Sequence, residues 1–307
     1  MTDRPPVAAG DRTALARLLS QVERGTAEAP ADDGAAYVVG ITGAPGAGKS
    51  TLTNALLRVA RDRGERVAVL AVDPTSPFTG GSILGDRLRM QDHATDDGVF
   101  IRSMATRGHL GGLSLAVPEA VRLLATVGWP LVLIETVGVG QVEVEVAGSA
   151  DTCVVVVNPG WGDAVQASKA GLMEIADVFV INKADREGTA QTHHDLEAML
   201  ELGARPTEGW RPPIVEAVST TGQGVADVWT AVESHRAAIS ATGELARRRA
   251  ARRVVELRNT VVRALERAAR ERIGDDAWRA AESRVAAGEL APAAAAEQLL
   301  APLLDHS

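Results

Sequence analysis

Residues 43–51 read Gly43-Ala44-Pro45-Gly46-Ala47-Gly48-Lys49-Ser50-Thr51, which matches the G-x-x-x-x-G-K-S/T pattern of a phosphate-binding loop. An apolar, strand-like run over 37–42 precedes this stretch, and apolar residues at helical spacing follow it. A loop between a strand and a helix N-terminus presents backbone N–H groups to an anion, and the helix dipole favours negative charge there. The stretch therefore predicts a P-loop in an α/β fold.

The residues of this loop are expected to share the contacts with a nucleoside triphosphate. Lys49 would reach the β and γ phosphates, Ser50 would place its hydroxyl on a Mg²⁺ ion, and Thr51 would cap the helix or contact the α phosphate. A glycine-rich turn that binds nothing is the alternative, and the flanking strand and helix argue against it. The nucleotide-binding residues predicted here are Gly43, Ala44, Pro45, Gly46, Ala47, Gly48, Lys49, Ser50 and Thr51.

A second motif, N-K-x-D from Asn182 to Asp185, predicts that the base is guanine. The Asp185 carboxylate accepts both the N1–H and the exocyclic amino hydrogens of guanine, whereas adenine has no matching pair of donors. The Lys183 stem is expected to lie over the base, and Asn182 to tie this loop to the P-loop. Ser219 and Thr220, after an apolar run, are a looser candidate for a second guanine-contacting loop, with a simple turn as the alternative.

Three carboxylates are candidates for the metal site and for catalysis, because magnesium needs oxygen ligands close to Ser50. Asp73 and Glu135 end apolar runs typical of strands, and Asp86 lies in the loop that follows Asp73. Glu135 also begins E-T-V-G where GTPases carry D-x-x-G, so the Gly138 amide is expected to sense the γ phosphate. Ordinary surface acids are the alternative. We expect Mg²⁺ ligands at Ser50, Asp73, Asp86 and Glu135, and catalytic roles for Lys49, Asp73 and Glu135.

Two segments, residues 73–82 and residues 138–141, have the composition of mobile loops and are candidate switches. A third segment, the loop 158–163, leads into a helix face that carries Gln166 and Lys169. Loops held by the γ phosphate and its metal, and released after hydrolysis, convert nucleotide state into shape. A plain polar helix start is the alternative for the third segment. No activating arginine is singled out, since a partner's residue qualifies as well as Arg87, Arg89, Arg102 and Arg107.

Apolar runs and helical patterns alternate from residue 37 onward, which predicts an α/β fold with a doubly wound, mostly parallel sheet. We expect three parts: a flexible N-terminus with a short helix over 1–35, a P-loop GTPase domain over 36–242, and a helical C-terminal arm over 243–307. The expected strands lie near 37–42, 66–72, 131–136, 152–157, 177–182 and 213–218.

The arm begins with a basic helical stretch from Glu244 to Arg272, which holds ten Arg and four Glu. A solvated helix face is one interpretation, and an arm for dimerisation or partner binding is the other. Nucleic acid is disfavoured, because the whole chain carries a net charge of −8. Two shorter helices are expected near 276–287 and 292–304. Apolar residues of the first helix recur at spacings of three and four, at Val254, Leu257, Val261, Leu265 and Ala268.

Composition excludes several other classes. The chain has no apolar run of about 18 residues, and its start lacks the charged-then-apolar pattern of a secretion signal. We therefore expect a cytoplasmic protein with no membrane partner. The isoelectric point of about 5.4 argues against nucleic acid as a partner. The single cysteine, Cys153, excludes an internal disulfide, and its apolar surroundings indicate an inert core residue.

Together, these motifs resemble the metallochaperone-related (SIMIBI-class) family of P-loop GTPases and, within it, the MeaB type. The resemblance covers roughly residues 12–240. The sequence segments that carry it are residues 71–74 together with 79–86, residues 135–141, and residues 174–177 together with 182–185. MeaB-type proteins are GTPase chaperones of adenosylcobalamin-dependent acyl-CoA mutases such as methylmalonyl-CoA mutase. The resemblance implies GTP or GDP with Mg²⁺, a third switch over 160–169 that signals to the mutase, homodimerisation through the C-terminal helices, and magnesium contacts from Ser50, Asp73, Asp86 and Glu135.

The leading hypothesis is a GTPase whose slow hydrolysis gates loading, protection or release of cobalamin on a partner mutase. A kinase of a transport-associated binding protein is the runner-up, although no acceptor site is evident and a kinase would not require guanine selectivity. A nucleotide-dependent scaffold with negligible turnover is a third possibility. Nickel and cobalt metallochaperones of the family carry Cys or His motifs, whereas Cys153 lies in a core strand and His193 and His194 have no third ligand nearby in sequence.

Overall fold

The computed structural model describes residues 11–24, 26–27, 36–74, 93, 95–106, 112–136, 148–160, 174–202 and 209–304. The chain divides into two compact units, Met1–Arg252 and Arg253–Ser307. The boundary falls inside helix α8 (Glu244–Ile273), so the first turns of this helix belong to the first unit.

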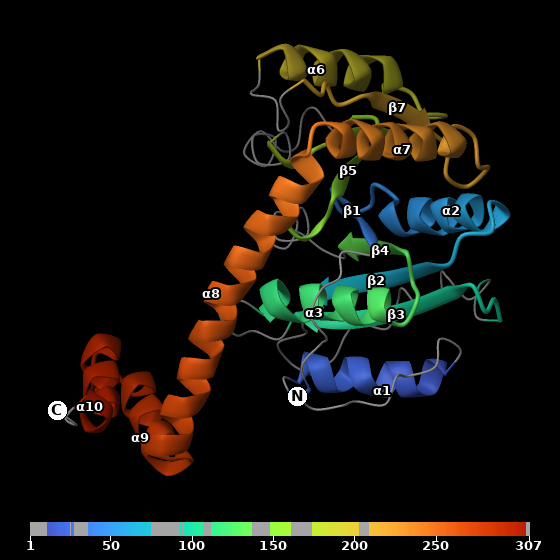
Figure 1. Cartoon of the computed structure of the whole chain (residues 1–307). Coiled ribbons are helices and arrows are strands. Elements are labelled where there is room, and N and C mark those ends of the chain that lie inside the picture. Colours follow the sequence, from blue (N-terminus) through green and yellow to red (C-terminus); the bar gives the residue numbers. More distant parts are fainter. Residues whose placement is uncertain are drawn as a thin grey trace. The chain divides into compact units, whose positions relative to one another are not determined.

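The first unit is built on a seven-stranded parallel sheet with the order β3-β2-β4-β1-β5-β6-β7 (Figure 1). Strands β2, β3 and β4 lie on one side of β1 in the sheet, and β5, β6 and β7 lie on its other side. The strand order therefore reverses at β1. Ligands of such sheets bind at the carboxyl ends of the strands where the order reverses. The predicted doubly wound sheet is confirmed. Its strands are β1 (Tyr37–Gly43), β2 (Val67–Pro74), β3 (Val99–Thr106), β4 (Leu131–Thr136), β5 (Thr152–Val157), β6 (Val178–Asn182) and β7 (Ile214–Ala217).

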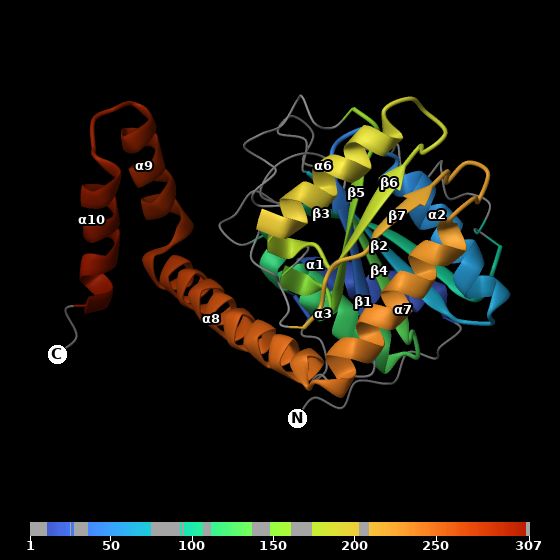
Figure 2. The same cartoon turned by 90° about the horizontal axis from the view of Figure 1, so that it is seen from above.

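Helices cover both faces of the sheet and give three layers (Figure 2). Alternate strand residues point to opposite faces, so Val39 packs in one core cluster and Val38 in the other. Because both faces are buried, β1, β4, β5 and β6 have no exposed position. One face is covered by α2 (Lys49–Asp62) and α7 (Val225–Ala241), and the other by α1 (Arg12–Glu23), α3 (Gly112–Thr126) and α6 (Thr189–Leu202).

Strand β3 was not among the six expected strands. It forms an edge of the sheet and pairs only with β2 among the described strands. Its apolar run is interrupted by Arg102 and Ser103, which hides the strand pattern. The Arg102 guanidinium donates to the Ala16 carbonyl at 3.0 Å and pairs with Glu23 at 2.6 Å, both on α1. The expected N-terminal helix is therefore confirmed, and β3 is part of its contact surface.

The second unit is helical, as expected. It contains the rest of α8, together with α9 (Asp275–Ala286) and α10 (Pro292–Leu304). Helix α8 has no buried residue. No helix in the described part of the chain combines the length and apolarity needed to span a bilayer. Large apolar side chains are exposed along α8 at Val254, Val255, Leu257, Val261, Val262 and Leu265.

Candidate functional site

The glycine-rich loop lies between β1 and α2, as the motif predicts. Gly43 has φ +132°, and a Cβ there would come within 2.0 Å of the Val156 carbonyl oxygen on the neighbouring strand. Gly48 has φ +93°, and its Cβ would come within 2.3 Å of Asn182 Nδ2. Both positions thus require glycine for backbone conformation and for close approach. The loop curls tightly between β5 and the loop that follows β6.

Helix α2 begins with its backbone donors available to an anion. Its N-cap, Gly48, provides no side-chain hydrogen bond, and the first turn carries no acidic residue. The first N–H groups of a helix have no partner within the helix, and its dipole places partial positive charge at this end. A phosphate group satisfies both conditions. The site therefore fits the anion that the motif predicts.

Lys49 lies within this loop and is buried. Its Nζ donates to the Gly43 carbonyl at 2.6 Å and to the Ala44 carbonyl at 3.1 Å. The ammonium group is thus held over the loop backbone, where the motif expects phosphate oxygens. The contact of this charge with a bound triphosphate stays a prediction of the motif.

Ser50 and Glu135 are brought together beside the loop. The Ser50 hydroxyl donates to Glu135 Oε1, and Glu135 has no exposed surface. Glu135 sits in β4, between β1 and β2, with register partners Ile41 and Ala71. A hydroxyl and a carboxylate oxygen in contact are the donor types that Mg²⁺ takes. These two of the four expected metal ligands therefore fit the ion.

The other expected ligands are less fully described. Asp73 lies in β2, whose register pairs Val72 with Thr136, the residue after Glu135. This places the Asp73 backbone at the same end of the sheet as Glu135. Asp86 and Gly138 lie outside the described residues, as do most of the candidate switches, 75–82, 138–141 and 161–169.

A pocket joins the P-loop helix to the loops after β6 and β7. It brings together Thr51 and every residue expected to contact the base. Arg186 and Val218 also line it and were not predicted, although each directly adjoins a predicted residue in sequence. The lining residues are Gly48, Thr51, Asn182, Lys183, Asp185, Arg186, Val218, Ser219 and Thr220.

Asn182 holds these three loops together from a buried position. Its Nδ2 donates to the Ala47 carbonyl at 2.8 Å, which is the tie to the P-loop expected from the sequence. Its Oδ1 accepts from the Ser219 hydroxyl at 2.7 Å and from the Ser219 amide at 3.2 Å. A buried amide with both ends satisfied fixes the relative position of the groups that it bonds. The pocket is thus preformed.

Lys183 has a left-handed backbone with φ +61°, and it is the one non-glycine residue with positive φ among those the structure describes. For a residue with a Cβ this conformation costs roughly 1–2 kcal/mol. Neighbouring contacts hold it, since Lys183 Nζ donates to the Gly46 carbonyl at 2.6 Å and the Ala184 amide to the Ala217 carbonyl at 3.1 Å. The turn directs Asp185 to the pocket, where its side chain is exposed.

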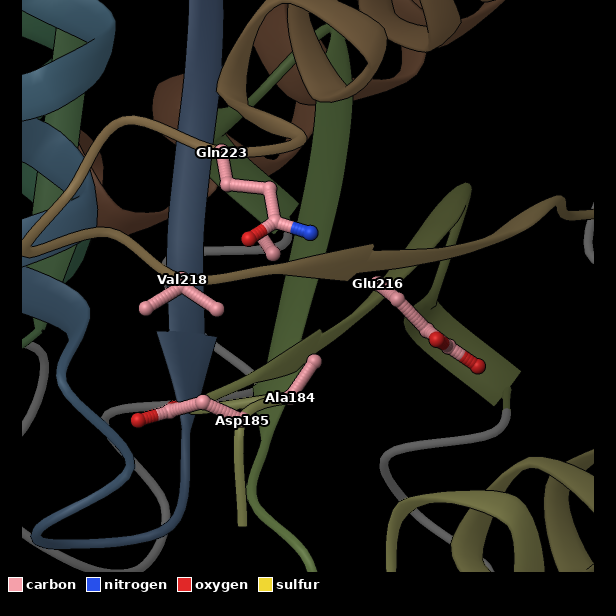
Figure 3. Close-up of a pocket in the computed structure, with 6 residues that line it drawn as sticks. Ala184, Asp185, Glu216, Val218 and Gln223 are labelled. Carbon is pink, nitrogen blue, oxygen red and sulfur yellow. The ribbon is translucent and has the colours of Figure 1, made fainter.

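A second hollow lies beside this pocket and shares Asp185 and Val218 with it. Figure 3 shows that the Asp185 and Glu216 carboxylates point in different directions, so they do not converge on one point. His193 Nδ1 lies 3.0 Å from Glu216 Oε1. Among the described residues, no group of three His, Cys, Asp or Glu side chains could hold a metal. We therefore assign no ion to this hollow, which Gln223 also lines.

Arg102 is excluded as an activating arginine. Its guanidinium donates to the Ala16 carbonyl, to the Ser20 hydroxyl at 3.0 Å and to the Glu23 carboxylate, all on α1. Arg87, Arg89 and Arg107 lie outside the described residues. Of the candidates expected from the sequence, these three and a partner's arginine are left.

Comparison with known proteins finds similarity along most of the chain. The family model described as methylmalonyl Co-A mutase-associated GTPase MeaB matches residues 16–273. A protein of Pyrococcus horikoshii that carries a GTPase name is 51% identical over 261 residues, covering 82% of each chain. The mouse protein named methylmalonic aciduria type A homolog, mitochondrial, is 37% identical over 228 residues, covering 73% of this chain and 55% of its own. A crystal structure of LAO/AO transport system kinase has a TM-score of 0.67 at 27% identity, covering 96% of this chain and 94% of that one.

Proposed function

The chain belongs to the MeaB family of methylmalonyl-CoA mutase-associated GTPases, and we propose that it gates adenosylcobalamin loading, protection or release on a methylmalonyl-CoA mutase-type enzyme. The chain is a GTPase, so hydrolysis of GTP to GDP and phosphate supplies the switch. The link to the mutase is supported by the family match, and the switch is supported by the Asn182 side chain, which joins the P-loop to the loops after β6 and β7 in one preformed pocket. That arrangement suits a protein that selects guanine over adenine nucleotides.

We assign the phosphate contacts to the P-loop backbone, Lys49 and Thr51, and the metal contacts to Ser50, Asp73, Asp86 and Glu135. When bound, Mg²⁺ would neutralise charge on the β and γ phosphates. The Lys49 ammonium stabilises the charge that develops on the phosphate oxygens as the bond to the γ phosphorus breaks. The buried Glu135 carboxylate, held by the Ser50 hydroxyl, accepts a hydrogen bond from the attacking water and so orients it.

We assign base recognition to the loops after β6 and β7. The Asp185 carboxylate accepts the two guanine N–H donors, and the Lys183 stem lies over the base. Ser219 supports this geometry through its two hydrogen bonds to Asn182, and Thr220 lines the same pocket. An adenine base would leave the carboxylate without its donors, which is the physical basis of selectivity.

We assign three loops to the task of signalling the nucleotide state to the mutase. Residues 73–82 and 138–141 would follow the γ phosphate, with the Gly138 amide as its sensor, and residues 160–169 would relay the state to the partner. In sequence these segments come at or after the carboxyl ends of β2, β4 and β5. Those strands end on the side of the sheet that carries the P-loop, which supports the assignment.

We also propose that the protein is a homodimer joined by its C-terminal helices. The support is the exposed apolar stripe of α8, in which Val254, Leu257, Val261 and Leu265 recur on one face. An exposed stripe of this length on a helix without buried residues is typical of a surface that a partner covers.

A kinase remains the second candidate, and its support is the name carried by the solved structure with TM-score 0.67. That name describes the other protein. The base pocket weighs against a kinase here, because a phosphoryl donor for a kinase needs no guanine selectivity. Transfer of labelled γ phosphate to a binding protein, rather than to water, would favour the kinase.

The test measures GTP hydrolysis with and without methylmalonyl-CoA mutase, and measures adenosylcobalamin transfer to the mutase in parallel. We expect a complex, a faster hydrolysis rate in that complex, and cobalamin transfer that requires hydrolysable GTP. ATP serves as the matched control and should support neither. No complex and no change in rate with any acyl-CoA mutase would contradict the chaperone function while leaving the GTPase activity intact.

A further inference from the structure

Two acidic residues, Asp151 and Asp177, are buried at the end of the sheet opposite the nucleotide site. Asp151 directly precedes β5 and Asp177 directly precedes β6. The far ends of the same strands lead into the loops 158–160 and 183–185. A strand of six residues, such as β5, is about 20 Å long. Each strand therefore connects a buried acid at one end to a nucleotide loop at the other.

Asp151 is held by arginines from the start of α8. Arg249 donates to it twice, from Nη2 at 2.7 Å and from Nε at 3.1 Å, and Arg252 donates to the same carboxylate. The Val38 amide on β1 adds a fourth bond at 3.0 Å. Two-point arginine–carboxylate pairs fix orientation as well as distance. This part of α8 is thus locked to β1 and β5.

Asp177 binds the same helix in the same way. Arg248 donates to both of its oxygens at 2.9 Å, and the Cys153 amide donates at 2.9 Å. His235 on α7 places Nε2 at 3.2 Å from the carboxylate. Taking away one partner of such a buried pair leaves an uncompensated charge, which makes the contact hard to open. Helices α7 and α8 are both fastened to the start of β6.

A hydroxyl, an imidazole and a carboxylate occur here in the order of a hydrolase triad. Thr152 Oγ1 lies 2.8 Å from His235 Nδ1, and His235 continues to Asp177. Thr152 and His235 have no exposed surface, so no substrate reaches them. The Tyr37 hydroxyl lies 2.5 Å from Thr152 Oγ1, and burial raises the pKa of Tyr37 to about 12, so it stays protonated. The chain of contacts is structural rather than catalytic.

These groups form a basal cluster, defined here as Tyr37, Asp151, Thr152, Asp177, His235, Arg248, Arg249 and Arg252. We propose that the basal cluster is a rigid joint that transmits the state of the loop after β5, through β5, to helix α8. The proposal rests on the proposed function only in taking GTP and GDP as the ligands that set the state of that loop. It requires that the two nucleotides favour different positions of β5 and that α8 moves with this strand.

The test compares backbone amide exchange of the full-length protein with GDP and with a non-hydrolysable GTP analogue. Nucleotide affinity is measured on the same samples. In the wild type we expect exchange over residues 253–273 of α8 to differ between the two states. Arg248→Lys keeps the charge but loses the two-point contact with Asp177, so we expect it to reduce that difference at least threefold. Both nucleotide affinities should stay within about twofold, since Arg248 lies at the opposite end of the strands from the pocket.

Arg279→Lys is the matched control, because Arg279 pairs with Asp276 at the surface of α9, outside the cluster. It should leave the difference unchanged. Arg252→Lys, at the rim of the cluster, provides the second test should Arg248→Lys fail to fold. Equal exchange of α8 in both states of the wild type, with both nucleotides bound, would overturn the joint. So would an unreduced difference in a folded cluster variant, whereas loss of guanine nucleotide binding by the wild type would contradict the proposed function instead.

Discussion

Replacing Asp185 by asparagine should change which base the protein prefers. A guanine base presents two N–H donors to the carboxylate. The amide that replaces it has one acceptor, and its NH₂ group faces the second donor. One charge-assisted hydrogen bond is then lost and the other loses its charge, at about 1.5 kcal/mol or more for each. The total of about 3 kcal/mol corresponds to a Kd for GTP that is roughly 100-fold weaker.

The same variant should bind xanthosine triphosphate better than the wild type does, because xanthine carries a carbonyl where guanine has its amino group. The introduced amide would donate to that carbonyl, so Asp185→Asn reverses the preference rather than abolishing binding. Competition against a fluorescent nucleotide gives both affinities. Asp185 is exposed, so the free energy of unfolding should change by less than about 0.5 kcal/mol.

Glu187→Gln is the matched control, since Glu187 is an exposed acid two residues along the same loop and does not line the base pocket. It makes the same change of charge and should leave both affinities within about twofold. A GTP affinity unchanged in Asp185→Asn would refute the base-reading assignment. Loss of GTP affinity with no gain for the xanthine nucleotide would show that the loop had merely been disturbed.

Three further changes probe other parts of the site and the fold. Lys49→Ala should lower GTP turnover by at least about 100-fold, because the ammonium group buried within the P-loop is removed; single-turnover assays measure this, and retained turnover would contradict the P-loop mechanism. Glu135→Gln keeps the side chain's size but removes its charge, so half-maximal activity should need roughly tenfold more Mg²⁺; an unchanged magnesium titration would argue against the metal assignment. Burial alone would raise the pKa of Asp177, but hydrogen bonds from His235 and Arg248 hold that pKa below its usual value. Its contribution to stability is therefore present above the unfolded pKa of about 4 and is lost as pH falls through the folded value. Urea unfolding should show a free energy that falls below about pH 4 and falls less in Asp177→Asn; a wild-type value constant down to about pH 2 would contradict this.

Much of the fold could be predicted because local patterns encode it. Buried parallel strands are continuously apolar, and the P-loop and N-K-x-D motifs mark where two of them end. The residues expected at the base lie around one pocket in the structure. Their roles as ligands stay predictions, as do those of Asp86 and Gly138, which lie outside the described residues.

The missed features depend on contacts that a local pattern does not encode. Arg102 and Ser103 break the apolar run of β3, and only the partner helix α1 explains why an arginine belongs there. The left-handed backbone of Lys183 is held by the bond from its Nζ to Gly46 in the P-loop and by the bond from the Ala184 amide to Ala217 at the end of β7. Propensity alone predicts an ordinary backbone for lysine, so tertiary contacts decide this turn.

The partners of the arginines at the start of α8 also could not be predicted from a local sequence pattern. The sequence leaves a solvated helix face and a partner-binding arm open, and neither describes Arg248, Arg249 and Arg252. These side chains turn inward to Asp151 and Asp177, which lie 71 to 101 residues away along the chain. A charge count cannot separate an arginine that faces water from one that neutralises a buried acid.

The amino-terminal helix α1 also affects how the molecule meets copies of itself. Strand β3 is an eight-residue edge, long enough to pair with a strand of another molecule, whereas the opposite edge, β7, has four residues. Helix α1 packs on β3 through Arg102, and its Arg12 guanidinium donates to the carbonyls of Asp96 and Val99 where the strand begins. An edge that a helix covers is a poor template for aggregation. By occupying these carbonyls, helix α1 is expected to hinder pairing of β3 with a strand of another copy.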